Sequence, residues 1–195
     1  MSEQQTLENR LIEATLRCVA RWGIAKTTLD DVAREAGCGR ATIYRTFEGG
    51  KASVLRATLQ HEFVRCIATI EDAMRGLDSL EDILVAGTTT AASFIAGHDA
   101  LQFLMAHEPD AVLPHVAFDK LARVFDAAAL FAEPHLAPFL PEAEVARAAE
   151  WVTRVVLSYA LAPTTLDLRV ESDARRLVNL YLMPALLPRA AVATR

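Results

Sequence analysis

Residues 27–51 read TTLDDVAREAGCGRATIYRTFEGGK and predict two short helices joined by a tight turn. Thr28 is suited to cap the first helix, because its hydroxyl can accept a hydrogen bond from a free backbone N–H. Apolar residues then recur at helical spacing, and Gly37 follows where a helix commonly ends in a left-handed residue. The second helix, from about Arg40 to Phe47, is expected to bury Ile43 and Phe47.

Four side chains of this second helix have no evident partner inside the protein: Arg40, Thr42, Tyr44 and Arg45. Arginine can bind guanine with two hydrogen bonds, and threonine can contact a thymine methyl group or a base edge. Tyrosine and lysine more often contact phosphates. The alternative is an ordinary solvent-exposed helix face. We favour a helix-turn-helix that places its second helix in the major groove of DNA.

The segment resembles the N-terminal signature of the TetR (tetracycline-repressor) family of bacterial transcriptional regulators. The resemblance rests on Thr28, the run DDVAREAG, the helix ATIYRTF and Lys51 at the start of the next helix. It implies that Thr28, Tyr44 and Lys51 bind the DNA backbone, whereas Arg40, Thr42 and Arg45 approach the bases. It also implies a homodimer that binds a near-palindromic operator, acts most often as a repressor, and is released by a small molecule.

Length and composition indicate a folded protein with a large core, because 52% of the 195 residues are hydrophobic and 23% are charged. The acidic N-terminus is unlike a signal peptide, and no long uncharged apolar run predicts a membrane span, so a cytoplasmic protein is expected. Residues 1–60 hold nine Lys/Arg and seven Asp/Glu, a net charge of +2, and residues 61–195 hold eleven and eighteen, a net charge of −7. The less acidic end is thus the end expected to face phosphates.

The periodicity predicts an all-α fold with two domains, a DNA-binding domain over 1–50 and an effector-binding and dimerisation domain over 51–195. A first helix is expected over 6–23 and a long helix over 51–75. Further helices are expected over 80–96, 100–106, 116–131, 142–161 and 173–187. The three prolines of 133–141 predict a loop, Ser172 is expected to cap the last helix, and Pro184 to bend or fray it.

The second domain carries aromatic residues that could line a pocket for an apolar effector, with three polar residues as anchors. In the family such a cavity lies among these helices, and an apolar pocket with few polar groups suits small molecules. Plain hydrophobic core is the alternative for each aromatic residue. The candidate ligand-binding residues are Phe94, His98, Gln102, Phe103, His107, Phe118, Phe125 and Trp151.

Two apolar stripes on the last long helices predict a homodimer formed as a four-helix bundle. Two interior helices of a monomer are the alternative. The stripes consist of Val145, Ala148, Ala149, Val152, Val156 and Tyr159 on one helix, and Leu177, Val178, Tyr181 and Leu182 on the other.

No metal, cofactor or catalytic function is expected. His98, Asp99, His107, Glu108 and His115 lack the tight spacing of zinc ligands, and motifs of hydrolases or phosphate-binding loops are missing. Cys18, Cys38 and Cys66 are expected to be small apolar fillers, with a redox role of Cys38 beside the turn as the alternative. The rival function is an all-α small-molecule carrier that does not bind DNA.

Overall fold

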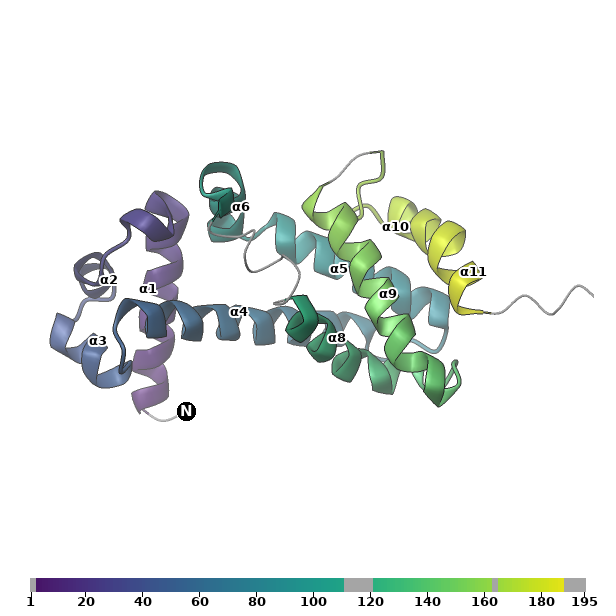
Figure 1. Ribbon diagram of the computed structural model, residues 1–195, viewed down its shortest axis with the longest axis horizontal. Coiled ribbons are helices and arrows are strands. Elements are labelled where there is room, and N and C mark those ends of the chain that lie inside the picture. The colour runs from purple at the N-terminus through teal and green to yellow at the C-terminus, as the bar shows by residue number, and fades with distance from the viewer. Residues whose placement is uncertain (1–2, 111–120, 163–164, 188–195) are drawn as a thin grey trace, which may run out of the picture. The chain divides into compact units, whose positions relative to one another are not determined.

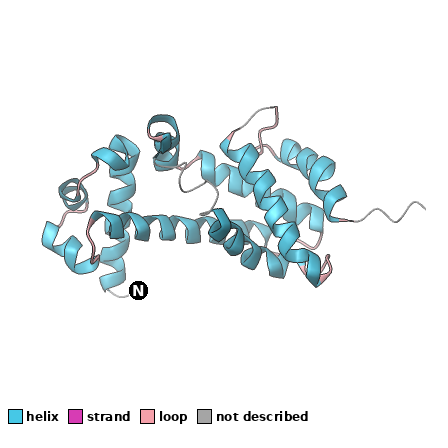
Figure 2. Cartoon of the chain, in the orientation of Figure 1, coloured by secondary structure: helices cyan, strands magenta, loops and turns pink. Residues whose placement is uncertain are grey.

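The computed structural model describes residues 3–110, 121–162 and 165–187, and these residues form helices and connecting turns without any strand (Figure 2). The all-α class is therefore confirmed. The helices are α1 Glu3–Lys26, α2 Leu29–Glu35, α3 Arg40–Thr46, α4 Lys51–Met74, α5 Leu80–Ala96, α6 Asp99–His107, α8 Leu121–Leu136, α9 Glu142–Leu161, α10 Glu171–Leu177, the π-helical turn η1 Val178–Leu182, and α11 Met183–Leu186. Among the described helices, none has both the length and the apolar character needed to cross a membrane.

The described chain divides into two compact units, and α4 passes from one into the other. Unit 1 contains α1, α2, α3, α6 and α4 up to Cys66; unit 2 contains α4 from Ile67 onward, together with α5 and α8 through α11. The boundary lies within a helix rather than at residue 50, and α6 joins the first unit. The expected domains of 1–50 and 51–195 differ from this division, because sequence spacing does not show that α6 packs on α1.

Unit 1 is built around a core to which α1, α2, α3 and the start of α4 all contribute (Figure 1). Ile43 of α3 and Leu11 of α1 are completely buried, and Phe47 is nearly so. The small residue Ala33 lies in the same core, where α2 meets its neighbours. The residues predicted to form the inner side of the two short helices are therefore the ones that are buried.

Unit 2 has its own core from α5, α8, α9 and the C-terminal helices. Both α5 and α9 have the bounds that were predicted for them, 80–96 and 142–161. Ser79 accepts a hydrogen bond from the Asp82 N–H and so caps α5. The predicted helix over 116–131 is described only from Leu121 onward.

Two expectations for the C-terminal region are wrong. The predicted loop over 133–141 is helical as far as Leu136, although Pro134 lies inside α8. The turns beyond the proline are held by hydrogen bonds from the Ala137 N–H to the Glu133 carbonyl and from the Leu140 N–H to the Leu136 carbonyl. Leu136 and Leu140 are buried in the unit 2 core, so tertiary packing outweighs the missing proline N–H.

The last helix also begins differently from its prediction, because Ser172 is not its cap. Helix α10 begins at Glu171 after Val170, whose carbonyl accepts hydrogen bonds from the N–H groups of Asp173 and Ala174. The chain stays helical through Pro184, which lies in the first turn of α11, and the π-helical turn η1 ends two residues before it. A wider turn accommodates a residue that cannot donate to the preceding helical turn.

Candidate nucleic-acid interface

The turn between α2 and α3 has the geometry that its sequence predicts. The Thr28 hydroxyl accepts a hydrogen bond from the Asp31 N–H, and the Asp31 carboxylate accepts from the Thr28 N–H, which forms a capping box. Hydrogen bonds from the side chain and backbone of Thr28 lower the pKa of Asp31. Gly37 has φ +63°, and the Cys38 N–H donates to the Ala33 carbonyl across the turn.

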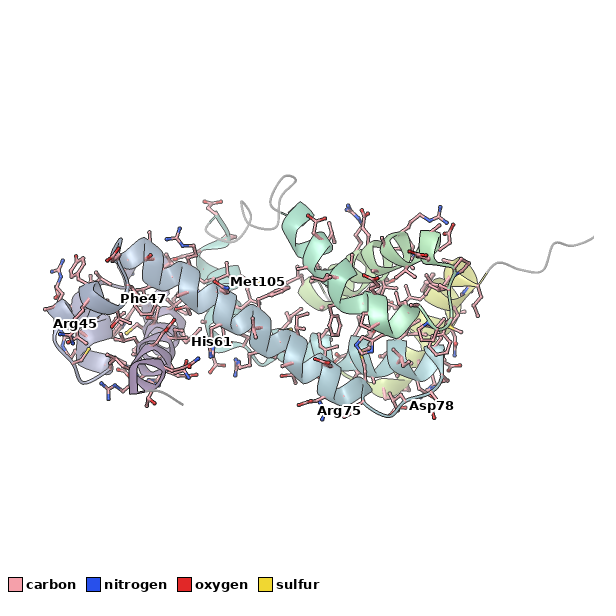
Figure 3. The ribbon with its side chains drawn as sticks, turned by 90° about the horizontal axis from the view of Figure 1, so that it is seen from below. Arg45, Phe47, His61, Arg75, Asp78 and Met105 are labelled. Carbon is pink, nitrogen blue, oxygen red and sulfur yellow. The ribbon has the colours of Figure 1, made fainter. Side chains whose placement is uncertain are left out.

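Helix α3 divides its side chains between the core and the solvent. Ile43 and Phe47 are buried, whereas Tyr44 and Arg45 are exposed and Thr42 is half-buried. Figure 3 shows Arg45 at the outer edge of unit 1 and Phe47 nearer its interior. The Thr42 carbonyl accepts a hydrogen bond from the Thr46 hydroxyl. The face left outward carries hydrogen-bond donors and an aromatic ring, as a DNA-reading helix requires.

Four of the six predicted DNA-binding residues line one open groove at the edge of α3. They are Thr28 from the cap of α2, Arg40 and Tyr44 from α3, and Lys51 from the first turn of α4. Thr42 and Arg45 lie outside its lining. The full lining is Ala25, Thr27, Thr28, Leu29, Asp30, Arg40, Tyr44, Gly49, Gly50 and Lys51.

Within the groove the guanidinium of Arg40 is held by two neighbours. One of its nitrogens donates to the Asp30 carboxylate at 3.2 Å, and another donates to the Tyr44 hydroxyl at 3.2 Å. The guanidinium carbon also lies 5.6 Å from the centre of the Tyr44 ring, within the range of a cation–π interaction. Asp30 belongs to the run DDVAREAG on which the resemblance rests, but its pairing with α3 was not predicted from the sequence.

Lys51 is anchored to the end of α1. Its ammonium donates to the Ile24 carbonyl at 2.6 Å, across 27 residues of sequence. Gly49 and Gly50 precede it with φ +100° and +64°, a turn that glycine adopts without strain. A Cβ at Gly50 would lie 3.3 Å from the Tyr44 ring, so the turn passes close to α3. The lysine charge is thereby placed beside Tyr44 and Arg40 in one groove.

A contact that sequence reasoning missed joins α6 to the same end of α1. The Glu108 carboxylate accepts hydrogen bonds from the N–H groups of Ile24, at 2.8 Å, and Ala25, at 3.3 Å. Gly23 makes room for it with φ 79° and ψ 173°. Since the partners are more than 80 residues apart, only the tertiary fold reveals that Glu108 and Lys51 hold the same turn.

The predicted ligand-binding residues are divided between the two units. In unit 1, His98 precedes α6 as its cap, and Gln102, Phe103 and His107 lie within α6. Phe94, Phe125 and Trp151 belong to unit 2, and Phe118 lies outside the described residues. Gln102 and Trp151 are exposed. Phe94 is half-buried on α5, and the Phe125 ring lies 4.1 Å from the Arg154 guanidinium carbon.

Two histidines expected to be ligand anchors make contacts within unit 1. His98 caps α6, because its Nδ1 accepts from the Leu101 N–H, and its Nε2 lies 3.0 Å from the buried Glu62 carboxylate. Burial raises the pKa of Glu62, whereas hydrogen bonds from His61 and Arg65 lower it. Together the lowering effects are larger, so the pKa of Glu62 lies below its ordinary value. The His107 ring stacks on Phe103 with 4.4 Å between centres. His115, also weighed as a metal ligand, lies outside the described residues.

Comparison with known proteins bears directly on this interface. Residues 11–58 match the family described as bacterial regulatory proteins of the tetR family. The matched segment runs from α1 to α4 and includes the capping box, α3 and the groove. This match and the relatives below support a TetR-family transcriptional regulator.

Relatives extend the similarity of this regulator beyond the matched segment. An uncharacterised HTH-type transcriptional regulator of Mycobacterium tuberculosis is 27% identical over 191 residues, which covers 96% of this chain and 89% of the relative. The TetR-family repressor AlkX of Dietzia is 19% identical, with TM-score 0.64 over 90% of this chain and 94% of its own. FadR of Bacillus subtilis, solved with stearoyl-CoA, is 16% identical, with TM-score 0.61 over 87% and 96%. These two structures share the fold of the regulator.

Proposed function

We propose that the regulator binds a near-palindromic operator as a homodimer, represses transcription, and is released by a small apolar effector. We further propose that it works in the cytoplasm and without catalysis. The observation that carries the DNA-binding part is the groove, where Thr28, Arg40, Tyr44 and Lys51 gather beside the exposed face of α3. A carrier without DNA binding would have no use for cations gathered beside the exposed Tyr44.

In this proposal α3 enters the major groove and Arg45 reads a base. Arg45 is exposed and makes no hydrogen bond or ion pair with the described part of the chain, so its guanidinium is available for two bonds to guanine. Thr42 lies on the same helix and supplies a methyl and a hydroxyl group. Thr28, Tyr44 and Lys51 would bind phosphates and set the register of α3.

The test is selection of tight-binding duplexes from a random-sequence library, followed by binding measurements with variants. Arg45→Ala should lose about 1–3 kcal/mol of operator affinity and relax the sequence preference at one position of each half-site. The control is Arg75→Ala, which removes an exposed arginine of unit 2 that pairs with Asp72. Equal affinity of the wild type and Arg45→Ala for the selected duplex would overturn the assignment of Arg45, and failure to select any sequence would overturn DNA reading altogether.

The dimer part of the proposal needs a different surface from the one that the sequence suggests. Val145, Ala148, Ala149 and Val156 are buried within a single chain, as are Leu177, Val178 and Leu182. These seven of the ten stripe residues therefore stabilise the fold of the single chain. Unit 2 nevertheless exposes large apolar side chains that suit a partner subunit, namely Leu130, Trp151, Leu180 and Tyr181.

The effector part is supported by the names of structural relatives and by the apolar character of unit 2. FadR was solved with stearoyl-CoA, and AlkX is implicated in biodegradation of n-alkanes. Stearoyl-CoA and a medium-chain n-alkane are thus the first probes. Either should release labelled operator from the wild type only if it binds the DNA-free conformation more tightly. Persistent operator binding at saturating amounts of both probes would contradict an acyl or alkyl effector.

Phe118→Ala separates a pocket from a plain core, as Phe118 lies in the aromatic set although outside the described residues. A pocket residue should change the effector response and leave operator affinity without effector near that of the wild type. A core residue should instead lower the stability by about 3–5 kcal/mol. Thermal melting and effector titration of this one variant distinguish the two.

A further inference from the structure

The groove at the proposed DNA interface contains an acidic side chain whose role the proposed function does not explain. Its charged lining consists of Asp30, Arg40 and Lys51. Both cations are already hydrogen-bonded inside the protein, Arg40 to the Asp30 carboxylate and Lys51 to the Ile24 carbonyl. A carboxylate at a surface that approaches phosphates repels them and competes with them for the guanidinium.

We propose that Asp30 restrains the affinity of the groove for DNA, because its carboxylate occupies Arg40 in place of a DNA phosphate or base. The inference rests on the proposed function, because it presumes that the groove faces the DNA backbone. It assigns to Asp30 a role that opposes binding, in a groove whose other polar groups favour it.

The exposure of the pair allows the exchange that this role requires. The side chains of Arg40 and Asp30 are 54% and 60% exposed, and ion pairs of that kind are held only weakly in water. A phosphate or a base can thus displace the carboxylate when α3 docks fully. In a loose non-specific complex the carboxylate keeps its hold on the guanidinium.

Tyr44 keeps Arg40 at the groove when the carboxylate is removed. Its hydroxyl accepts from Arg40 at 3.2 Å, and its ring lies beneath the guanidinium. The capping box of α2 uses Thr28 and Asp31, so it does not depend on Asp30. Asp30→Asn should therefore leave α2 folded and Arg40 in place, with its charge free for a phosphate.

The two kinds of complex should respond differently to Asp30→Asn. Non-specific binding is almost entirely phosphate electrostatics, so an extra phosphate contact strengthens it in full. In the operator complex Arg40 has already left Asp30 for the DNA, so the substitution adds no contact there but removes a repulsive charge and the cost of breaking the ion pair. Affinity for both kinds of duplex should consequently rise, and only the non-specific complex should gain a phosphate contact.

The experiment measures binding of the full chain to the selected operator and to a random-sequence duplex of equal length, by fluorescence anisotropy at several salt concentrations. Asp30→Asn should raise the affinity for the random duplex roughly 3- to 10-fold and steepen its salt dependence by about 0.9 in log–log slope for each DNA-binding unit engaged. Operator affinity should rise at least as much, at an unchanged slope.

Two further variants make the result specific. Glu13→Gln removes one exposed carboxylate from α1 that does not line the groove, and it should change neither slope. In an Arg40→Gln background, Asp30→Asn should no longer steepen the salt dependence, because the cation that it frees is gone. Circular dichroism melting should show that each variant is folded.

Unchanged or weakened binding of the random duplex by Asp30→Asn would overturn the inference, as would an equal effect of Glu13→Gln. Steepening that persists without Arg40 would overturn it too. Wild-type protein that binds no duplex would instead overturn the proposed function, and the inference with it. If the wild type binds its operator, a contrary result with the Asp30 variant overturns only the inference about Asp30 and leaves the proposed function standing.

Discussion

Lys51 serves both the fold of unit 1 and the proposed contact with DNA. Its ammonium donates to the Ile24 carbonyl and lines the groove. Lys51→Ala should weaken binding to all duplexes alike and lower the salt slope by about 0.9 for each phosphate that the protein no longer neutralises. It should also lower the stability by about 1 kcal/mol, because the carbonyl loses its partner.

Anisotropy titrations over salt and thermal denaturation measure the two effects of Lys51→Ala separately. The matched control is Lys26→Ala, an exposed lysine at the end of α1 that does not line the groove. A salt slope equal to that of the wild type would contradict a phosphate contact by Lys51.

Gly23 is required by a close approach rather than by its position in a helix. Its φ of 79° with ψ of 173° strains other residues, and a Cβ there would lie 2.2 Å from the Glu108 carboxylate. Gly23→Ala should lower the stability by about 2–4 kcal/mol, through strain and through weaker hydrogen bonds to Glu108. Gly39→Ala, where a Cβ meets no atom within 4 Å, should cost less than about 1 kcal/mol in chemical denaturation. Equal losses at both positions would contradict this account.

At the scale of elements, the capping box decides where α2 begins. Thr28→Ala should lower the stability by about 1 kcal/mol, whereas Thr28→Ser should retain most of it, because serine keeps the hydroxyl that accepts from the Asp31 N–H. Denaturant titration at neutral pH measures the difference. Two variants of equal stability would show that the box contributes nothing.

The capping box also has a pH dependence with a definite sign. The pKa of Asp31 is lowered from 3.8 by hydrogen bonds from Thr28. The ionised Asp31 carboxylate therefore contributes fully to the stability of the fold above the pKa that it has in the unfolded chain. The contribution is lost as the pH falls through the lower folded pKa. The stability gap between the wild type and Thr28→Ala should therefore narrow on acidification below about pH 4.

Some elements follow from sequence alone and others do not. The bounds of α5 and α9 match their prediction because apolar periodicity and a terminal glycine or proline act locally. The end of α8 does not, because burial of Leu136 and Leu140 carries the helix past Pro134. The sequence predicts a serine cap at the start of α10, yet the Val170 carbonyl organises the first turn.

At the scale of the whole molecule, Leu180 is the position that tests the dimer most cleanly. It is 55% exposed although it is a large apolar side chain of η1. Leu180→Asp should leave the chain folded and yield monomers, since a charge in an apolar interface is costly. Val152→Asp should instead destabilise the chain itself, because Val152 packs against the unit 2 core. Sedimentation velocity at micromolar concentration decides, and a wild type that sediments as a monomer would contradict the proposal.

The sequence by itself determined the all-α class, the helix-turn-helix and its inward and outward faces. These features depend on the spacing of apolar residues along one or two helices and on helix caps and turn glycines. All of these act between residues that are close in the sequence. Only the tertiary structure decided that Arg40 is paired with Asp30 and that Glu108 and Lys51 hold one turn of α1. It also decided that most of the stripe residues of α9, α10 and η1 are buried inside one chain. Such contacts join residues that are far apart in the sequence. Packing of the whole chain selects the partners, so a local sequence pattern does not predict them.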